Sequence, residues 1–402
     1  MQPAPSYPFA QRLNHVETSA IREVFKLLGR PGIISFAGGF PDSALFDVAH
    51  IEEAARQALT QQAAQALQYG ATEGFMPLRE QLAALMQARG ASVRAEQLIV
   101  TTGSQQALDL VGKTLAEPGC KVIVEGPTFL AAIQCFRLYG AQVISAPADA
   151  HGVQPGALER LIDEHRPRFV YLIPTFGNPG GATLTLERRR RVLELAVRHQ
   201  TLIIEDDPYG QLWFDAPPPS LLALTSEVPG SRDWLIHCGS LSKILSPGLR
   251  LGWMTAPAPL LAQAVMCKQF SDANTSAFAQ AVAANYLAAG HLGQALENAR
   301  RVYARRARVM GQALREQLGQ AIAFTPPQGG LFIWARLTGA GGALADGAAL
   351  APKAIAQGVA FVPGAPFFAT QPDAATLRLS FATAGEDDIR EGVARLARAL
   401  RV

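Results

Sequence analysis

Short apolar runs alternate with longer helical patterns between about residues 95 and 256, and this alternation restricts the possible fold more than any other feature of the sequence. Seven runs are typical of buried strands, namely Gln97–Thr101, Lys121–Val124, Gln142–Ser145, Phe169–Ile173, Leu202–Glu205, Leu235–Cys238 and Gly252–Thr255. The helices predicted between them include Ser104–Ala116, Phe129–Tyr139, Gly156–Glu164 and Leu186–Arg198. Near-continuous apolar strands separated by helices predict an α/β fold, with a mostly parallel seven-stranded sheet covered by helices on both faces.

The rest of the chain follows different patterns. Residues 1–45 are punctuated by proline and glycine around one helical stretch, Ser19–Leu28. After Asn285 we expect a long helix over His291–Leu318, short strands near Phe332–Arg336, Val359–Val362 and Leu377–Phe381, and a helix over Glu386–Leu400. The sequence therefore predicts a large domain at 46–285, a smaller α+β domain at 286–402, and an N-terminal segment, 1–45, that packs with the small domain.

The composition allows a large core and argues against several kinds of partner. Hydrophobic residues make up 49% of the 402 residues and charged residues 17%, with a net charge of +3. That balance is too even to indicate nucleic acid or a membrane surface as a main partner. No apolar run reaches the roughly 18 residues of a membrane span, and residues 1–8 lack the pattern of a secretory signal. The four cysteines and seven histidines lack metal-ligand spacing, which predicts a cytoplasmic protein with free thiols and no metal site.

Lys243 lies in the segment Ser240-Leu-Ser-Lys-Ile-Leu-Ser-Pro-Gly-Leu-Arg250, just after the apolar run ending at Cys238. A lysine at the end of a buried strand can lose its proton by desolvation and form a Schiff base with an aldehyde. Ser240, Ser242 and Arg250 offer two hydroxyls and a planar cation, which suit a phosphate. An aldehyde and a phosphate on one small molecule suggest pyridoxal 5'-phosphate. Taken alone, the segment could equally be a surface loop with two solvated cations.

Two more candidate groups follow apolar strands. Asp206 comes after Leu202-Ile-Ile-Glu, and a carboxylate there could hold the nitrogen of a pyridoxal ring protonated, so that the ring accepts electrons. Tyr209 could donate a hydrogen bond to the ring's phenolic oxygen. Asn178 precedes Pro179, which restricts its backbone to conformations that could direct its amide at a ligand. An acidic turn and a plain Asn-Pro turn remain the alternatives.

The other candidates are residues whose role depends on their surroundings. Ser104 and Gln105 begin a predicted helix, whose free N–H groups and dipole favour a phosphate, although Ser104 could be only a helix cap. Phe129 could supply a flat face for a cofactor ring or belong to the core. Arg378, inside an apolar strand, requires an anionic partner, which could be a substrate carboxylate or an internal salt bridge. Gly39 permits close backbone approach to a ligand, or a tight turn.

Taken together, these motifs resemble the fold-type I pyridoxal-phosphate aminotransferases of class I/II over nearly the whole chain. The matching elements, in order, are Phe36-Ala-Gly-Gly, Tyr69-Gly with Gly74 and Leu78-Arg-Glu, Gly103-Ser-Gln, Asn178-Pro, Asp206-x-x-Tyr209, Ser240-x-Ser-Lys243-x-x-x-Pro-Gly-x-Arg250 and Arg378. The wording Ile33-Ile-Ser-Phe-Ala-Gly-Gly-Phe-Pro and Glu205-Asp-Asp-Pro-Tyr is most similar to the 2-aminoadipate/kynurenine aminotransferase branch. The resemblance implies the fold of aspartate aminotransferase and a homodimer with shared active sites.

The resemblance also implies a role for each matching residue. Lys243 would carry the cofactor and move the substrate's α-proton, Asp206 would pair with the pyridine nitrogen, and Asn178 and Tyr209 would hydrogen-bond the phenolic oxygen. The phosphate would be held by Ser104, Gln105, Ser240, Ser242 and Arg250, together with Tyr69 of the partner subunit. The substrate would be bound by Arg378, the Gly39 backbone, Asn178 and, at a distal carboxylate, Arg22.

Two positions depart from the family's usual pattern. Phe129 stands where the family usually has tyrosine, which keeps a stacking face and loses a hydroxyl. The chain has Gly177-Asn178-Pro-Gly180-Gly181 where the family usually reads Gln-Asn-Pro-Thr-Gly, so the asparagine is kept and its neighbours' side chains are lost.

The activity implied by the resemblance is transfer of an amino group from an L-amino acid to a 2-oxo acid, 2-oxoglutarate or pyruvate, with ping-pong kinetics. The same cofactor supports β-elimination and decarboxylation, so a lyase is the alternative enzyme. A ligand-sensing domain of a transcription regulator is the alternative from another class, although no basic segment of helix-turn-helix size precedes residue 19.

Overall fold

A large sheet forms the centre of the protein, whose computed structural model describes residues 7–15, 31–340 and 344–401. Its eight strands lie in the order β2-β9-β8-β7-β6-β3-β4-β5. They are β2 (Leu98–Thr101), β3 (Lys121–Gly126), β4 (Gln142–Asp149), β5 (Gly152–Val153), β6 (Phe169–Leu172), β7 (Leu202–Asp206), β8 (Leu235–Ser240) and β9 (Gly252–Thr255). Neighbouring strands from β4 to β8 are parallel, whereas β9 is antiparallel to both of its neighbours.

The predicted α/β fold is confirmed, with one strand more than expected. Seven strands form where the apolar runs predict them, and every residue of β6 and β8 is buried because helices cover both faces of the sheet. The additional strand, β5, has two residues and pairs antiparallel with the end of β4 through Ala148 and Val153. A strand of two residues is too short to produce a recognisable hydrophobic pattern.

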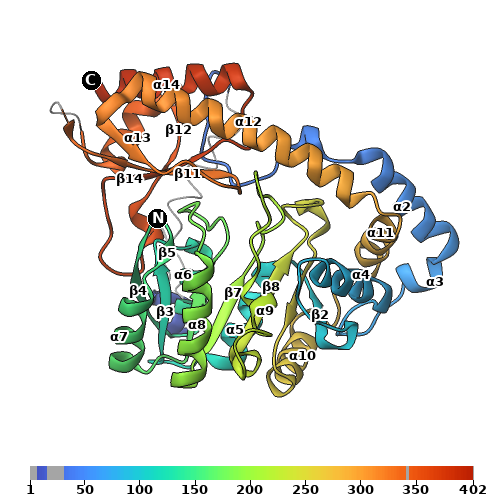
Figure 1. Ribbon diagram of the computed structural model, residues 1–402. Coiled ribbons are helices and arrows are strands. Elements are labelled where there is room, and N and C mark those ends of the chain that lie inside the picture. The colour runs from blue at the N-terminus through green and yellow to red at the C-terminus, as the bar shows by residue number, and fades with distance from the viewer. Residues whose placement is uncertain (1–6, 16–30, 341–343, 402) are drawn as a thin grey trace.

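Helices cover both faces of the sheet (Figure 1). The helices of this part are α2 (Val48–Gln61), α3 (Ala63–Ala66), α4 (Met76–Gln87), α5 (Ser104–Leu115), α6 (Leu130–Leu138), α7 (Pro155–His165), α8 (Leu186–His199), α9 (Leu221–Leu224), α10 (Ala258–Asp272) and α11 (Ala277–Ala288). Of these, α2 and α3 pack against α11 at the side of the sheet. Helix α8 contacts α7 and α9, while α5 contacts α6 and α10, so each group forms its own layer. No helix of the described residues combines the length and the apolar character needed to cross a bilayer.

A second, antiparallel sheet has the strand order β10-β11-β14-β13. Its strands are β10 (Ile322–Phe324), β11 (Phe332–Leu337), β13 (Val362–Pro363) and β14 (Thr376–Ser380), and the helices beside it are α12 (Leu292–Leu318), α13 (Gly347–Ala356) and α14 (Glu386–Arg401). Figure 1 shows α12 extending from the neighbourhood of α11 to α14, above the large sheet.

The start of the described chain joins this second part. Strand β1 (Ile34–Ser35) pairs in parallel with β12 (Val359–Ala360), and the Phe36 N–H donates to the Ala360 carbonyl at 2.7 Å. The segment after β1 is thereby fixed between the two sheets. The helix expected over Ser19–Leu28 lies outside the described residues, and the domain limits 1–45, 46–285 and 286–402 stay a prediction.

Candidate active site

The candidate residues gather at one edge of the large sheet. Asp206 is the last residue of β7, Ser240 is the last residue of β8, and Lys243 follows three residues later. Asn178 lies six residues after β6, and Ser104 opens α5 after β2. Because these strands run in the same direction, their carboxyl ends meet at one edge, which is where open α/β sheets bind ligands.

The Lys243 side chain points into the protein. Its Nζ donates a hydrogen bond to the carbonyl oxygen of Gly39 at 2.8 Å, across 204 positions of sequence. Burial, followed by the nearby charges of Arg378 and Arg250, lowers the pKa of Lys243 to about 8. The amine is therefore a solvent-shielded nucleophile, and the alternative of a solvated surface lysine is wrong.

Asp206 lies in a run of three buried carboxylates whose outer members are already paired with cationic or basic groups. Glu205 lies 2.7 Å from the Nδ1 of His237, and its oxygens accept hydrogen bonds from the backbone N–H groups of Leu221 and Leu222. Although burial opposes ionisation, His237 holds the pKa of Glu205 below its ordinary value. Asp207 accepts a hydrogen bond from Arg89 at 2.6 Å.

Asp206 itself has no cationic partner among the described residues. Asp206 is 2% exposed. Its Oδ2 accepts a hydrogen bond from the Tyr171 hydroxyl at 2.7 Å, whereas its Oδ1 has no hydrogen-bond partner. Burial raises the pKa of Asp206 to about 6, against the effect of the Tyr171 hydrogen bond, which lowers it. A buried carboxylate with one free oxygen is suited to a cationic N–H of a ligand.

Arg378 is another buried charge without a counter-ion among the described residues. It lies within β14, is 3% exposed, and donates hydrogen bonds of 2.8 Å to the Asn178 Oδ1 and to the Ala37 carbonyl. Its guanidinium lies 4.4 Å from the centre of the Phe332 ring and 5.1 Å from that of Phe367, and its Nε has no hydrogen-bond partner.

The surroundings of Arg378 decide between an internal salt bridge and a substrate carboxylate as its anionic partner. Burial lowers its pKa to about 10. No carboxylate of the described residues forms an ion pair with it, so the internal salt bridge considered from the sequence is wrong. An unpaired buried guanidinium beside an amide is suited to a ligand carboxylate.

Tyr209 completes the buried end of the site. Its ring meets that of Phe332 edge-on, with 6.0 Å between the centres, and Phe332 also contacts Arg378. Burial raises the pKa of Tyr209, so the phenol keeps its proton at neutral pH and can donate it in a hydrogen bond. The structure thus brings Lys243, Asp206, Asn178, Tyr209 and Arg378 into one neighbourhood.

The expected phosphate groups form a more open cluster. Gly103, with φ of +75°, is the cap of α5, so Ser104 is the first helical residue and its alternative role as the cap is wrong. A Cβ on Gly103 would lie 2.5 Å from the Arg250 guanidinium, which shows how closely that arginine approaches the start of α5. The backbone N–H of Ser242 donates to the Ser240 Oγ at 3.1 Å. Backbone N–H groups, hydroxyls and a cation meet here, as a phosphate requires.

Three predicted residues are not tied to this cluster by the described contacts. Phe129 stands at the start of α6, half-buried and packed against the main hydrophobic core. Tyr69 is 85% exposed in the single chain, and Gln105 is also exposed. Arg22 lies outside the described residues.

The described groups fit pyridoxal phosphate. The shielded amine of Lys243 suits its aldehyde, the unpartnered Asp206 Oδ1 suits its ring nitrogen, and the α5 N-terminus with Arg250 suits its phosphate. Arg378 remains free for the carboxylate of a second molecule.

Four contributors to the site were not predicted from the sequence, namely Tyr171, Phe332, Phe367 and the Ala37 carbonyl. Tyr171 was recognisable only as a polar ring inside a buried apolar strand, Phe169–Leu172. Nothing in the sequence indicates that its hydroxyl meets Asp206, because the two residues come from different strands, 35 positions apart.

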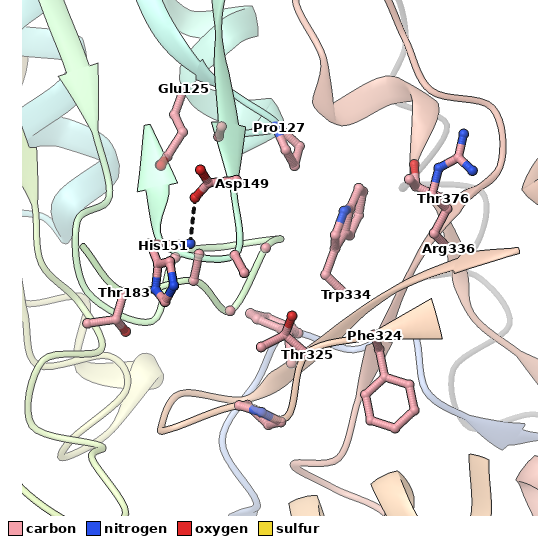
Figure 2. A pocket seen from close by; sticks show the side chains of 18 of the residues that line it. Glu125, Pro127, Asp149, His151, Thr183, Phe324, Thr325, Trp334, Arg336 and Thr376 are labelled. Atoms are coloured by element: carbon pink, nitrogen blue, oxygen red, sulfur yellow. Dashed lines mark hydrogen bonds between the residues drawn. The ribbon is translucent and has the colours of Figure 1, made fainter. Parts of the chain in front are cut away.

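A cleft of about 540 Å³ adjoins the site and is lined in part by the segment around Asn178. Figure 2 shows it between the β4–β5 turn, with Asp149 and His151, and the second sheet, with Trp334 and Arg336. Asn178 and Phe332 are shared between the cleft and the cluster around Arg378. The cleft therefore separates the two sheets next to the buried end of the site.

The sequence profile of the family described as aminotransferase class I and II matches residues 32–396. The 2-aminoadipate transaminase of Thermus thermophilus is 42% identical over 98% of this chain and 97% of its own length.

Two solved structures share the fold closely. The α-aminoadipate aminotransferase LysN from Thermus thermophilus, solved with N-(5'-phosphopyridoxyl)-L-leucine, superposes with a TM-score of 0.89 and 40% identity, covering 98% of this chain and 97% of LysN. The kynurenine aminotransferase of Pyrococcus horikoshii superposes with a TM-score of 0.91 and 37% identity, with the same coverage of both chains. Likeness at this level extends over essentially the whole of each protein.

Proposed function

The chain belongs to the class I and II aminotransferases, and on that premise we propose how its own residues move an amino group from an L-amino acid to a 2-oxo acid with pyridoxal 5'-phosphate as cofactor. One observation carries the assignment of roles. Two buried groups without charged partners, the Asp206 carboxylate and the Arg378 guanidinium, act on the pKa of the same shielded amine, that of Lys243. One is suited to the cofactor ring and the other to the substrate.

Lys243 has two tasks in this proposal. Its Nζ would hold the cofactor through the aldehyde carbon, with loss of water. Once displaced by the substrate's amine, the free Nζ would take the proton from the substrate's α-carbon and deliver it to the former aldehyde carbon. When bound, pyridoxal phosphate supplies an electron-accepting ring that makes the α-proton acidic. A pKa near 8 keeps a useful fraction of the amine unprotonated near neutral pH.

The residues around Lys243 fix the positions of the reactants. Asp206 would keep the ring nitrogen protonated through its free Oδ1, and Tyr209 and Asn178 would hydrogen-bond the phenolic oxygen. Arg378, Asn178 and the Gly39 backbone bind the substrate's α-carboxylate, which places the α-carbon near the Nζ. Phe129 is assigned to the face of the ring.

The phosphate end includes a residue from a second copy of the chain. We assign Ser104, Gln105, Ser240, Ser242 and Arg250 to the phosphate, together with Tyr69 of the partner subunit of a homodimer. Tyr69 is 85% exposed in the single chain, and the nearby apolar residue Leu67 is 71% exposed. Such a surface supports a partner.

Transfer proceeds in two half-reactions, so the first product leaves before the second substrate binds. The acceptor is 2-oxoglutarate or pyruvate, and the donor is drawn from amino acids with a distal carboxylate, an aromatic ring or a branched chain. The residues assigned to the cofactor come from the large domain, 46–285. All four cysteines are free thiols in the structure, which supports a cytoplasmic location.

Lys243→Ala tests the proposal. This variant is expected to bind pyridoxal phosphate without a covalent bond and to lose measurable transamination, because it lacks both the nucleophile and the proton carrier. Lys353→Ala, an exposed lysine on α13, is the matched control and should keep wild-type activity. Normal turnover by Lys243→Ala would overturn the assignment.

The choice between a transaminase and a lyase requires a separate experiment. Purified protein is incubated with a panel of amino acids and no oxo acid. A transaminase stops after one equivalent of product per active site, whereas a lyase continues to release product. The same panel identifies the donor by its half-reaction rate.

A further inference from the structure

Tyr171 makes the one side-chain hydrogen bond found on Asp206 among the described residues. Its hydroxyl donates to the Asp206 Oδ2 at 2.7 Å, and both side chains are buried. Tyr171 lies on β6, which pairs with β7, the strand that ends at Asp206. The Tyr171 ring is packed edge-on against Phe136, with 5.6 Å between the centres, so the hydroxyl has a fixed position.

The flanking carboxylates show why a neutral donor matters at this position. Glu205 meets His237 and Asp207 meets Arg89, so each has a basic or cationic partner. Successive residues of a strand face opposite sides, so the Glu205 and Asp206 side chains point apart, and neither His237 nor Arg89 forms an ion pair with Asp206. The charges of Asp207 and Glu205 still raise the pKa of Asp206, and that of His237 lowers it. A cation at Oδ2 would neutralise Asp206 and weaken its hold on a second cation, whereas a phenol leaves the negative charge in place.

On the proposed function, we infer that Tyr171 is a positioning residue that keeps Asp206 ionised and turns its free oxygen, Oδ1, toward the nitrogen of the cofactor ring. The hydrogen bond occupies Oδ2 and so fixes the rotation of the carboxyl group. It also favours the charged form, because a hydroxyl donates more strongly to a carboxylate than to a carboxylic acid. Tyr171 thereby acts on the cofactor only through Asp206.

The direction of the pH effect follows from this role. Burial raises the pKa of Asp206 to about 6, and the Tyr171 hydrogen bond counteracts that rise. Removing the hydroxyl raises this pKa further, so a larger fraction of Asp206 is neutral near pH 7. A neutral carboxyl cannot pair with a protonated ring nitrogen, and cofactor affinity falls.

Tyr171→Phe removes the hydroxyl and keeps the ring. The apoprotein is titrated with pyridoxal phosphate from pH 6 to 9 while bound cofactor is measured by absorbance. We expect about tenfold weaker binding at pH 7, the loss typical of a hydrogen bond to a charged group, and a smaller difference at pH 9, where Asp206 is ionised in both proteins. Tyr139→Phe is the matched control, because the Tyr139 hydroxyl also donates to a carboxylate, that of Asp109 at 2.6 Å, away from the site.

A double-mutant cycle with Asp206→Asn separates positioning from general destabilisation. If Tyr171 acts through the charge of Asp206, adding Tyr171→Phe to Asp206→Asn causes little further loss of affinity. The same loss in both backgrounds, or wild-type affinity and pH dependence in Tyr171→Phe, overturns the inference. Should Tyr171→Phe alone fail to fold, Asp206→Asn is compared with the Asp206→Asn/Tyr171→Phe double variant. In both of these proteins residue 206 has no carboxylate that would be left buried without a hydrogen bond.

The wild-type apoprotein distinguishes a failure of this inference from a failure of the proposed function. If wild-type protein does not bind pyridoxal phosphate, the proposed function is wrong and Tyr171 is not the cause. If it binds and the Tyr171→Phe titration is unchanged while Tyr139→Phe is also unchanged, only the role of Tyr171 is wrong.

Discussion

The two arginines assigned to anions lie in opposite environments. Arg378 is 3% exposed, lies between the rings of Phe332 and Phe367, and has an Nε without a partner. Arg250 is exposed, has a left-handed φ of +52°, and contacts the backbone carbonyls of Pro247 at 3.3 Å and Thr102 at 3.5 Å.

The difference shows how one residue type serves two purposes. A buried unpaired guanidinium is unfavourable for the empty protein, so the anion that enters gains a strong, unscreened interaction. An exposed guanidinium costs little and is screened by water, so it contributes as one member of a group with backbone N–H donors. The buried Arg378 should therefore bind the substrate's carboxylate, and the exposed Arg250 should help to retain the cofactor's phosphate.

The largest expected effect comes from the buried end. Arg378→Leu should lower kcat/KM for the amino donor about a hundredfold or more, because a buried charge partner is worth about 3 kcal/mol, while cofactor affinity changes little. Steady-state kinetics and a cofactor titration measure the two quantities. Arg390→Leu, an exposed arginine on α14 paired with Asp387 at 3.1 Å, is the control and should stay near wild type. An Arg378→Leu variant with normal kcat/KM would remove the distinction between the two ends.

A smaller effect is expected at the open end. Arg250→Leu should weaken pyridoxal phosphate binding about tenfold, as for loss of one charge-assisted interaction. Added salt should narrow the gap between variant and wild type, because the arginine is exposed. The measurement is a cofactor titration at low and high ionic strength, with Arg390→Leu, an exposed arginine paired with Asp387, as control. An equal loss of cofactor affinity at all salt concentrations would contradict the interpretation that the charge of Arg250 is screened by solvent.

The smallest expected effect is that of the two arginines on the pKa of Lys243. The rate at which apoprotein captures pyridoxal phosphate should rise with pH through an inflection near pH 8, because only the neutral amine attacks an aldehyde and the pKa of Lys243 is lowered to about 8. Arg378 and then Arg250 contribute to that lowering after burial. The inflection should therefore move to higher pH in Arg378→Leu and by less in Arg250→Leu. Stopped-flow rates between pH 6 and 10 measure this inflection. A larger shift in Arg250→Leu than in Arg378→Leu would contradict the expectation that Arg378 has the stronger effect on Lys243.

Most of the large sheet could be predicted from the sequence because its strands are buried on both faces. Every residue of a strand such as β6 is buried, and three of its four residues are apolar; a run of that kind between two helical patterns indicates a buried strand. Strand β5 could not be predicted, since its two residues are defined by pairing with β4 and not by their own pattern. Pairing is a property of two segments, so a single short segment carries no sign of it.

The candidate site was predictable to the level of residue types and spacing. The motif around Lys243 and the strand-end positions of Asp206 and Asn178 were enough to indicate a cofactor with an aldehyde and a phosphate. The partner of each group was not predictable. The sequence left Arg378 with either a salt bridge or a substrate, and only its neighbours, an amide and a carbonyl, decide between them.

The sequence by itself determined the order of the elements, the position of the reactive lysine and the set of polar groups at the strand ends, because these follow from local pattern and spacing. The tertiary structure alone decided which of three adjacent carboxylates lacks a cation, that Arg378 has an amide and a carbonyl as partners instead of a carboxylate, and that Tyr171 meets Asp206. The physical reason is that burial and pairing depend on segments far apart in the chain. Lys243 and Gly39, separated by 204 positions, meet at 2.8 Å only when both sheets are in place.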